Sequence, residues 1–120
     1  MGSRRKSREL AVQMLFQWEM GGHTPEHVIA TFLAGKKLDA DARSFAQALF
    51  EETAQETAEL DRRLGERSAH WRPERMAAVD RNVLRLALHE LLHHPETPPK
   101  VVINEALEIV RRYSGEDSVE

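Results

Sequence analysis

The spacing of the apolar residues is the feature that most limits how this chain can fold. Apolar side chains recur every three or four residues, as at Leu10, Met14 and Trp18. This spacing is typical of helices, and no stretch shows the strict alternation of a half-buried strand. Glycines and prolines separate the helical segments from one another. The sequence therefore predicts an all-α helical bundle.

Five substantial helices are expected. Their approximate bounds are 3–20, 25 to the stop at Gly35, 41–64, 78–93 and 100–113, with a short helix at 73–77. The second helix has a clear start, because Thr24 can cap it and Pro25 suits the first helical position. Gly65 is expected to cap the long third helix. The buried line of that helix is predicted to be Phe45, Leu49, Thr53, Leu60 and Leu64.

The composition is that of an ordinary globular protein. The 120 residues suit one domain, and 41% are hydrophobic and 31% charged. There is no cysteine, so neither a disulfide nor thiolate chemistry is expected. The chain has no apolar run typical of a signal peptide and none near the roughly 20 residues of a membrane span. We therefore expect a cytoplasmic protein that makes no membrane contact.

The charges are distributed unevenly. The basic tip, residues 3–8, holds Arg4, Arg5, Lys6 and Arg8 without a single acid. All 20 acidic residues follow it, against 13 of the 17 basic ones. A basic tip on an acidic body indicates a local contact with an anion, although a solvated N-terminus explains the same charges equally well.

The string HELLH, residues 89–93, matches the zinc-protease signature H-E-x-x-H. On a helical wheel His89 and His93 fall on the hydrophilic face beside Arg85, whose charge opposes a metal ion. A catalytic zinc also needs a third protein ligand, and the sequence singles none out. The favoured interpretation is that both histidines are solvated, that Glu90 is a hydrogen-bonded structural acid, and that the leucines are core. No metal site and no catalytic residue is predicted.

The first helix carries a different signal. Its core arc is Leu10, Ala11, Met14, Leu15 and Trp18, whereas Phe16 shares the outward face with Val12, Arg5, Arg8 and Glu9. Basic side chains neutralise phosphates, and an exposed aromatic ring can stack on an unpaired base. The alternative is that Phe16 packs on a neighbouring helix, and the wheel does not decide between the two.

Several segments together resemble the NusB family of bacterial transcription antitermination factors. They are RRKSRELAVQMLFQWE, WRPERM, VDRNVLRLALHELLHHPETPPKVVINEALEIVRRYSGEDS. The resemblance implies one all-helical domain, 1–120, of two packed bundles, about 3–65 and about 73–120. It implies no cofactor and no enzymatic activity. The implied partners are boxA-type RNA, the small-subunit ribosomal protein NusE, and the RNA polymerase antitermination complex that also serves ribosomal RNA transcription.

The resemblance also assigns roles to individual residues. The family's basic motif corresponds to Arg4, Arg5, Lys6 and Arg8 as phosphate contacts. The aromatic position of its first helix, often tyrosine, corresponds to Phe16. A family acid at the start of the 78–93 helix corresponds to Asp80, an expected contact with NusE, with Glu74 close by. The GEDS turn is expected to place Asp117 near the RNA.

Two expectations concern the end of the chain and an alternative role. The family continues past GEDS with a further helix, which is absent up to Glu120. The second bundle is therefore expected to be incomplete, with reduced stability or with self-association as a homodimer through the uncovered apolar face. The alternative role is that of a detached NusB-like RNA-binding domain of a ribosomal RNA cytosine methyltransferase.

Overall fold

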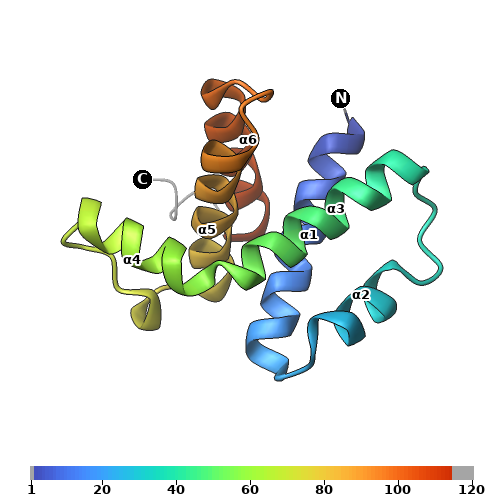
Figure 1. Cartoon of the computed structure of the whole chain (residues 1–120), viewed down its shortest axis with the longest axis horizontal. Helices are drawn as coiled ribbons and strands as arrows, with labels where there is room; N and C mark the ends of the chain where they lie inside the picture. The colour runs from blue at the N-terminus through green and yellow to red at the C-terminus, as the bar shows by residue number, and fades with distance from the viewer. Residues whose placement is uncertain (1, 115–120) are drawn as a thin grey trace. The chain divides into compact units, whose positions relative to one another are not determined.

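The computed structural model describes residues 2–114, and Asp117, a predicted RNA contact, lies outside them. No strand occurs within this range, and the predicted all-α fold is confirmed (Figure 1). The described elements are α1 (Gly2–Gly21), α2 (Pro25–Leu33), α3 (Ala40–Gln55), α4 (Thr57–Arg67), the 3-10 turn η1 (Pro73–Arg75), α5 (Ala78–His93) and α6 (Pro99–Ser114). None of these helices is both long and apolar enough for a membrane crossing.

The chain divides into two compact units, residues 1–54 and residues 55–120. The first unit holds α1, α2 and α3, and the second holds α4, α5 and α6. The sequence instead suggested that the first bundle reaches about residue 65. The difference concerns α4, which packs against α5 and so belongs to the second unit.

The long helix predicted over 41–64 is broken at Glu56. This residue has φ −101° and ψ 9°, outside the helical range, and it separates α3 from α4. Neither a glycine nor a proline marks the break, so the usual punctuation does not reveal it. The expected cap Gly65 lies inside α4, which continues to Arg67, so that prediction is wrong.

The first unit buries much of the apolar arc predicted for α1. Leu10, Met14 and Leu15 are buried, and α1 packs against α2. The predicted start of α2 is confirmed, because the Thr24 side chain accepts a hydrogen bond from the His27 backbone N–H at 3.1 Å. Phe50, which the predicted core line of α3 omitted, is fully buried.

In the second unit, α5 runs alongside α6 (Figure 1), and its buried face differs from the predicted one. Leu91 and Leu92, expected in the core, are 39% and 40% exposed. The predicted solvation of the histidines is wrong for His89, which is only 2% exposed. The buried set on α5 is instead Asn82, Val83, Arg85, Leu86, His89 and Glu90. A wheel based on hydrophobicity alone misplaces this face, because Arg85 and His89 are buried against the acids Asp61 and Glu56.

Candidate nucleic-acid interface

The basic tip begins at the start of α1, and a buried hydrogen bond fixes it to α3. The Ser7 hydroxyl, which is fully buried, donates to the Ala42 carbonyl oxygen at 2.9 Å. The Asp39 carboxylate in turn accepts the Ala42 backbone N–H at 2.7 Å and so satisfies a free donor at the start of α3. The two helix starts are thereby held next to each other within the first unit.

Arg4 uses this proximity to contact two residues of α3. Its guanidinium lies 3.9 Å from the centroid of the Phe45 ring, and its Nη2 lies 3.3 Å from an Asp41 carboxylate oxygen. Both members of the ion pair are exposed, so the pair stabilises the fold by at most about 1 kcal/mol. Arg4 is therefore oriented by α3 while its charge stays accessible to an anion.

The other basic residues of the tip divide into two kinds. Arg5 and Lys6 are exposed. Arg8 is only 5% exposed, and its guanidinium lies 5.5 Å from the Phe45 centroid. The structure thus brings Arg4 and Arg8 to one aromatic ring. A phosphate contact by Arg8 would require its side chain to leave that ring.

Phe16 lies two turns further along α1 than Arg8 and is 39% exposed. Its ring keeps access to solvent, as stacking on a base requires. Glu9 and Val12, expected on the same outward face, are instead buried. The predicted face is therefore not uniformly exposed, because α1 has neighbouring helices on more than one side, with α2 along it and α3 at its start.

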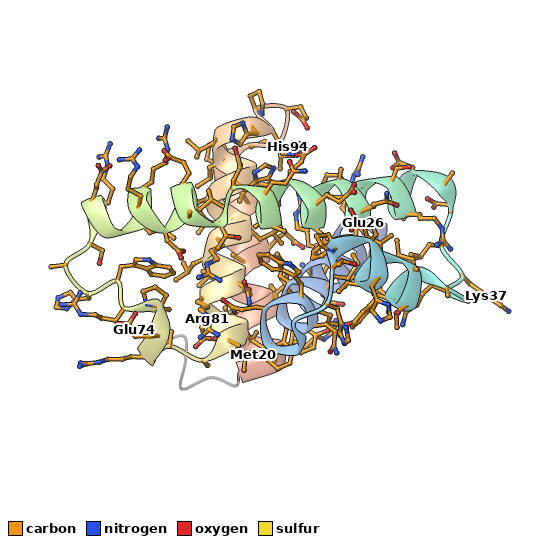
Figure 2. All side chains as sticks on the ribbon, turned by 60° about the horizontal axis from the view of Figure 1, so that its bottom comes forward. Met20, Glu26, Lys37, Glu74, Arg81 and His94 are labelled. Carbon is orange, nitrogen blue, oxygen red and sulfur yellow. The ribbon has the colours of Figure 1, made fainter. Side chains whose placement is uncertain are left out.

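The two residues predicted to contact a protein partner belong to the second unit. Glu74 is exposed on η1, and Asp80 is half-buried in the first turn of α5. Arg81 connects the two elements, because its Nη1 donates to the carbonyl oxygens of Pro73 and Met76 at 3.1 and 2.8 Å. Figure 2 shows Glu74 and Arg81 beside this turn. Both acids therefore lie within one structured corner.

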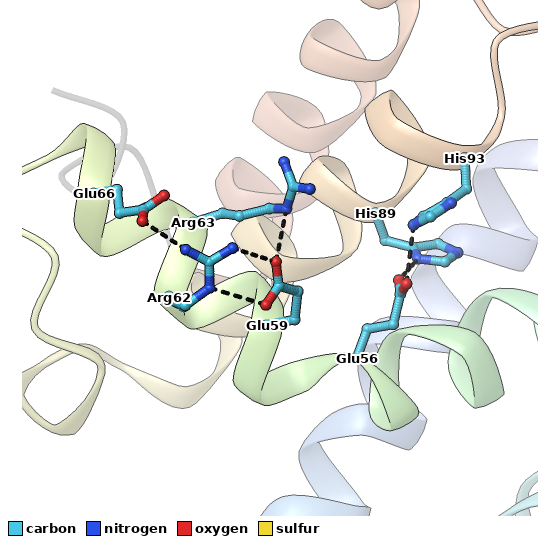
Figure 3. A network of polar contacts seen from close by, with 7 residues as sticks. All are labelled: Glu56, Glu59, Arg62, Arg63, Glu66, His89 and His93. Carbon is cyan, nitrogen blue, oxygen red and sulfur yellow. Dashed lines mark hydrogen bonds and ion pairs between the residues drawn. The ribbon is translucent and has the colours of Figure 1, made fainter.

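Three polar residues of α5 pair with acids on α4 or directly before it, and the sequence did not indicate these pairs. Both carboxylate oxygens of Asp61 accept hydrogen bonds from Arg85, each at 2.8 Å. His89 Nδ1 lies 2.6 Å from one carboxylate oxygen of Glu56, and His93 Nε2 lies 3.0 Å from the other (Figure 3). Asp61 and Arg85 are 24 residues apart, and no local motif marks either acid.

Exposed charges along α4 pair with one another. Glu59 accepts hydrogen bonds from Arg62 and Arg63, and Arg62 also bonds Glu66 (Figure 3). The hydrogen bond from Arg62 is the main reason that the pKa of Glu59 falls from 4.5 to about 2. The same carboxylate raises the pKa of Arg62. These arginines are neutralised within their own helix.

Comparison with known proteins gives a consistent result. A model of the NusB family matches residues 5–120. "Transcription antitermination protein NusB" of Koribacter versatilis (strain Ellin345) is 52% identical over 120 residues, covering 99% of this chain and 82% of that protein. The structure of T. maritima NusB matches with a TM-score of 0.86 at 33% identity, covering 96% of this chain and 81% of that one. A structure of the antitermination factors NusB and NusE in complex with dsRNA shares the fold, with a TM-score of 0.86 at 24% identity, over 98% of this chain and 87% of that one.

Proposed function

The chain belongs to the NusB family, and from that premise we propose that it is a transcription antitermination factor. In this role it binds boxA-type RNA together with the ribosomal protein NusE, as part of the antitermination complex on RNA polymerase, and supports ribosomal RNA transcription. Such work on nascent transcripts takes place in the cytoplasm. The role is one of binding and requires no catalytic residue.

The observation that carries the proposal is the exposed cationic start of α1 together with an exposed ring on the same helix. Arg5 and Lys6 are exposed, and Arg4 is held by contacts that an anion can replace at little cost. Phe16 adds an accessible aromatic face. Cations that neutralise phosphates and a ring that stacks on a base are what binding of single-stranded RNA needs.

We assign the protein contact to the other unit. Glu74 and Asp80 offer carboxylates on the corner that Arg81 holds, and NusE is the expected partner there. Asp117 remains a predicted RNA contact, on residues that the structure does not describe. The alternative of a methyltransferase's RNA-binding domain is less favoured, because a relative 52% identical over nearly the whole chain is named an antitermination protein.

The test is a titration of a boxA-like RNA at several salt concentrations, with and without NusE. Weak binding is expected for the protein alone and tighter binding with NusE. For single-stranded RNA the slope of log K against log salt is about −0.7 per phosphate neutralised. Replacing Arg5 and Lys6 by alanine should therefore reduce the magnitude of the slope by about 1.4.

A matched control replaces two arginines that α4 already neutralises, Arg62 and Arg63, and should leave the slope unchanged. A further variant replaces all four cations of the basic tip and should flatten the slope further. An unchanged slope in that variant would remove the basic tip from the RNA site. Equal losses in the α4 control would mean that only the total charge matters.

A further inference from the structure

The two histidines of the HELLH string meet a carboxylate that lies far from them in the sequence. Glu56 is at the break between α3 and α4, 33 residues before His89. Its two oxygens lie 2.6 Å from His89 Nδ1 and 3.0 Å from His93 Nε2. The ring centroids of the two histidines are 4.8 Å apart. One carboxylate thus bridges two imidazoles one helical turn apart, as Figure 3 shows.

We propose that Glu56, His89 and His93 form a binding site for a divalent metal ion of the zinc type. The set supplies the third protein ligand that HELLH alone lacks. Two imidazoles and one carboxylate are ligands that zinc accepts in sites that keep a fourth position open. The proposal concerns a site separate from RNA binding and does not depend on it.

The geometry lies close to what a metal ion needs. Candidate ligand atoms of the three residues all lie within 4.8 Å of one another. Tetrahedral zinc with bonds of about 2.0–2.1 Å separates its ligand atoms by about 3.3 Å. The present separations of 2.6 and 3.0 Å therefore need to widen by about 0.7 and 0.3 Å, and the remaining separations between ligand atoms, which are at most 4.8 Å, need to approach the same value. His89 is buried and so already fixed, whereas His93 is 46% exposed and can adjust.

The nearby cations are already neutralised. Arg85, one turn before His89, argued against a dication when only the sequence was considered. In the structure its guanidinium is held by both oxygens of the Asp61 carboxylate. Arg63, on α4, bonds Glu59 at 3.1 Å. The positive charge that opposed a metal ion is therefore balanced by local acids.

Space for a further ligand adjoins the cluster. A hollow of about 220 Å³ is lined by Glu56, Glu59, Leu60, Arg63, Leu92 and His93. A water molecule or an external ligand can occupy the fourth position from this side. The motif's own acid, Glu90, would have to serve as the general base of a hydrolase, but it is 1% exposed, so the site is assigned to binding and not to hydrolysis. A bound ion would join the start of α4 to the end of α5.

The test is calorimetric titration of the untagged full chain with zinc chloride. One zinc per chain is expected. His93→Ala and Glu56→Gln should each weaken binding about tenfold or more, because loss of even an outer partner of a metal site costs about that much. His70→Ala removes an exposed histidine of the same unit outside the cluster and should leave the affinity unchanged. His89 is not replaced, since it is buried and its loss could unfold the chain.

A second measurement separates the metal site from a fold defect. Excess zinc should raise the melting temperature of the native chain and of His70→Ala, because a ligand that binds only the folded state stabilises it. The melting temperatures of His93→Ala and Glu56→Gln should rise less at the same zinc concentration. Equal affinity in the native chain and His93→Ala, or uptake of zinc that never saturates at one ion per chain, would overturn the proposal.

Discussion

The start of α1 and the helix α4 both carry closely spaced arginines, but they differ in where the acids that pair with them lie. In α4 each of Arg62 and Arg63 bonds Glu59, within four residues on the same helix. In α1 no acid lies within residues 1–8, and Arg4 reaches its carboxylate, that of Asp41, on another helix. The difference shows that the placement of acids decides whether an arginine is available to an external anion.

Buried charges of the second unit extend the comparison. Arg85 is 4% exposed and depends on one acid of α4, Asp61. This ion pair links α4 to α5, whereas the ion pairs along α4 are exposed and join residues of one helix. An arginine–carboxylate pair therefore joins two helices at Arg85 and Asp61, whereas at Glu59 it only neutralises the charges of neighbouring arginines.

The largest effect is expected from Asp61→Asn, which removes the carboxylate charge that faces the buried Arg85. Loss of one partner of a buried pair costs about 3 kcal/mol of unfolding free energy, at the low end of the usual range because Asp61 is partly exposed. Urea denaturation followed by circular dichroism measures it. Arg62→Ala is the control and should leave the stability nearly unchanged, because its ion pairs are exposed. Similar losses of unfolding free energy in the two variants would mean that the buried pair stabilises the fold no more than an exposed one.

An intermediate effect is expected from Phe16→Ala in α1. Loss of a stacking ring should weaken RNA binding by about 1–3 kcal/mol. Phe16→Leu keeps an apolar side chain without a π face and should lose about as much, whereas Phe16→Tyr should bind normally. The melting temperature should change little, because the ring is already 39% exposed. If Phe16→Leu binds RNA as tightly as the native chain, the Phe16 ring does not stack on an RNA base and serves only as an apolar contact.

The smallest effect concerns the titration of Glu59. Its folded-state pKa of about 2 lies below the ordinary value of 4.5, mainly because of the hydrogen bond from Arg62. Its contribution to stability is therefore full above about pH 4.5 and is lost as the pH falls through about 2. The contribution is small, because the pair is exposed. NMR titration of the carboxyl carbon should show the low pKa, and Arg62→Ala should return it towards 4.5. A native Glu59 that titrates near 4.5 would mean that α4 does not neutralise its arginines.

Much of the fold could be predicted from local patterns. Thr24 and Pro25 mark the start of α2, and α5 occupies the predicted residues 78–93. These predictions succeed because capping, proline geometry and helical periodicity act over a few residues. The break at Glu56 was not predictable in this way, since no glycine or proline occurs between residues 40 and 64.

The residues of the candidate sites also divide into those that local sequence reveals and those that depend on distant partners. The basic tip and Phe16 could be named from the sequence, because a local charge run and an off-arc aromatic are visible there. The burial of Arg8 against Phe45 was not visible, nor was the contact of Glu56 with His89 and His93. Each depends on a partner more than thirty residues away.

By itself, the sequence determined the helical class, most helix starts and the location of the basic tip. Only the tertiary structure decided which polar residues are buried. His89 and Arg85, expected on the surface, are buried, because Glu56 directly before α4 and Asp61 on α4 supply hydrogen-bond acceptors and charges that offset the cost of burial. A helical wheel considers one helix at a time, whereas the free energy of burying a charge depends on the neighbour that faces it.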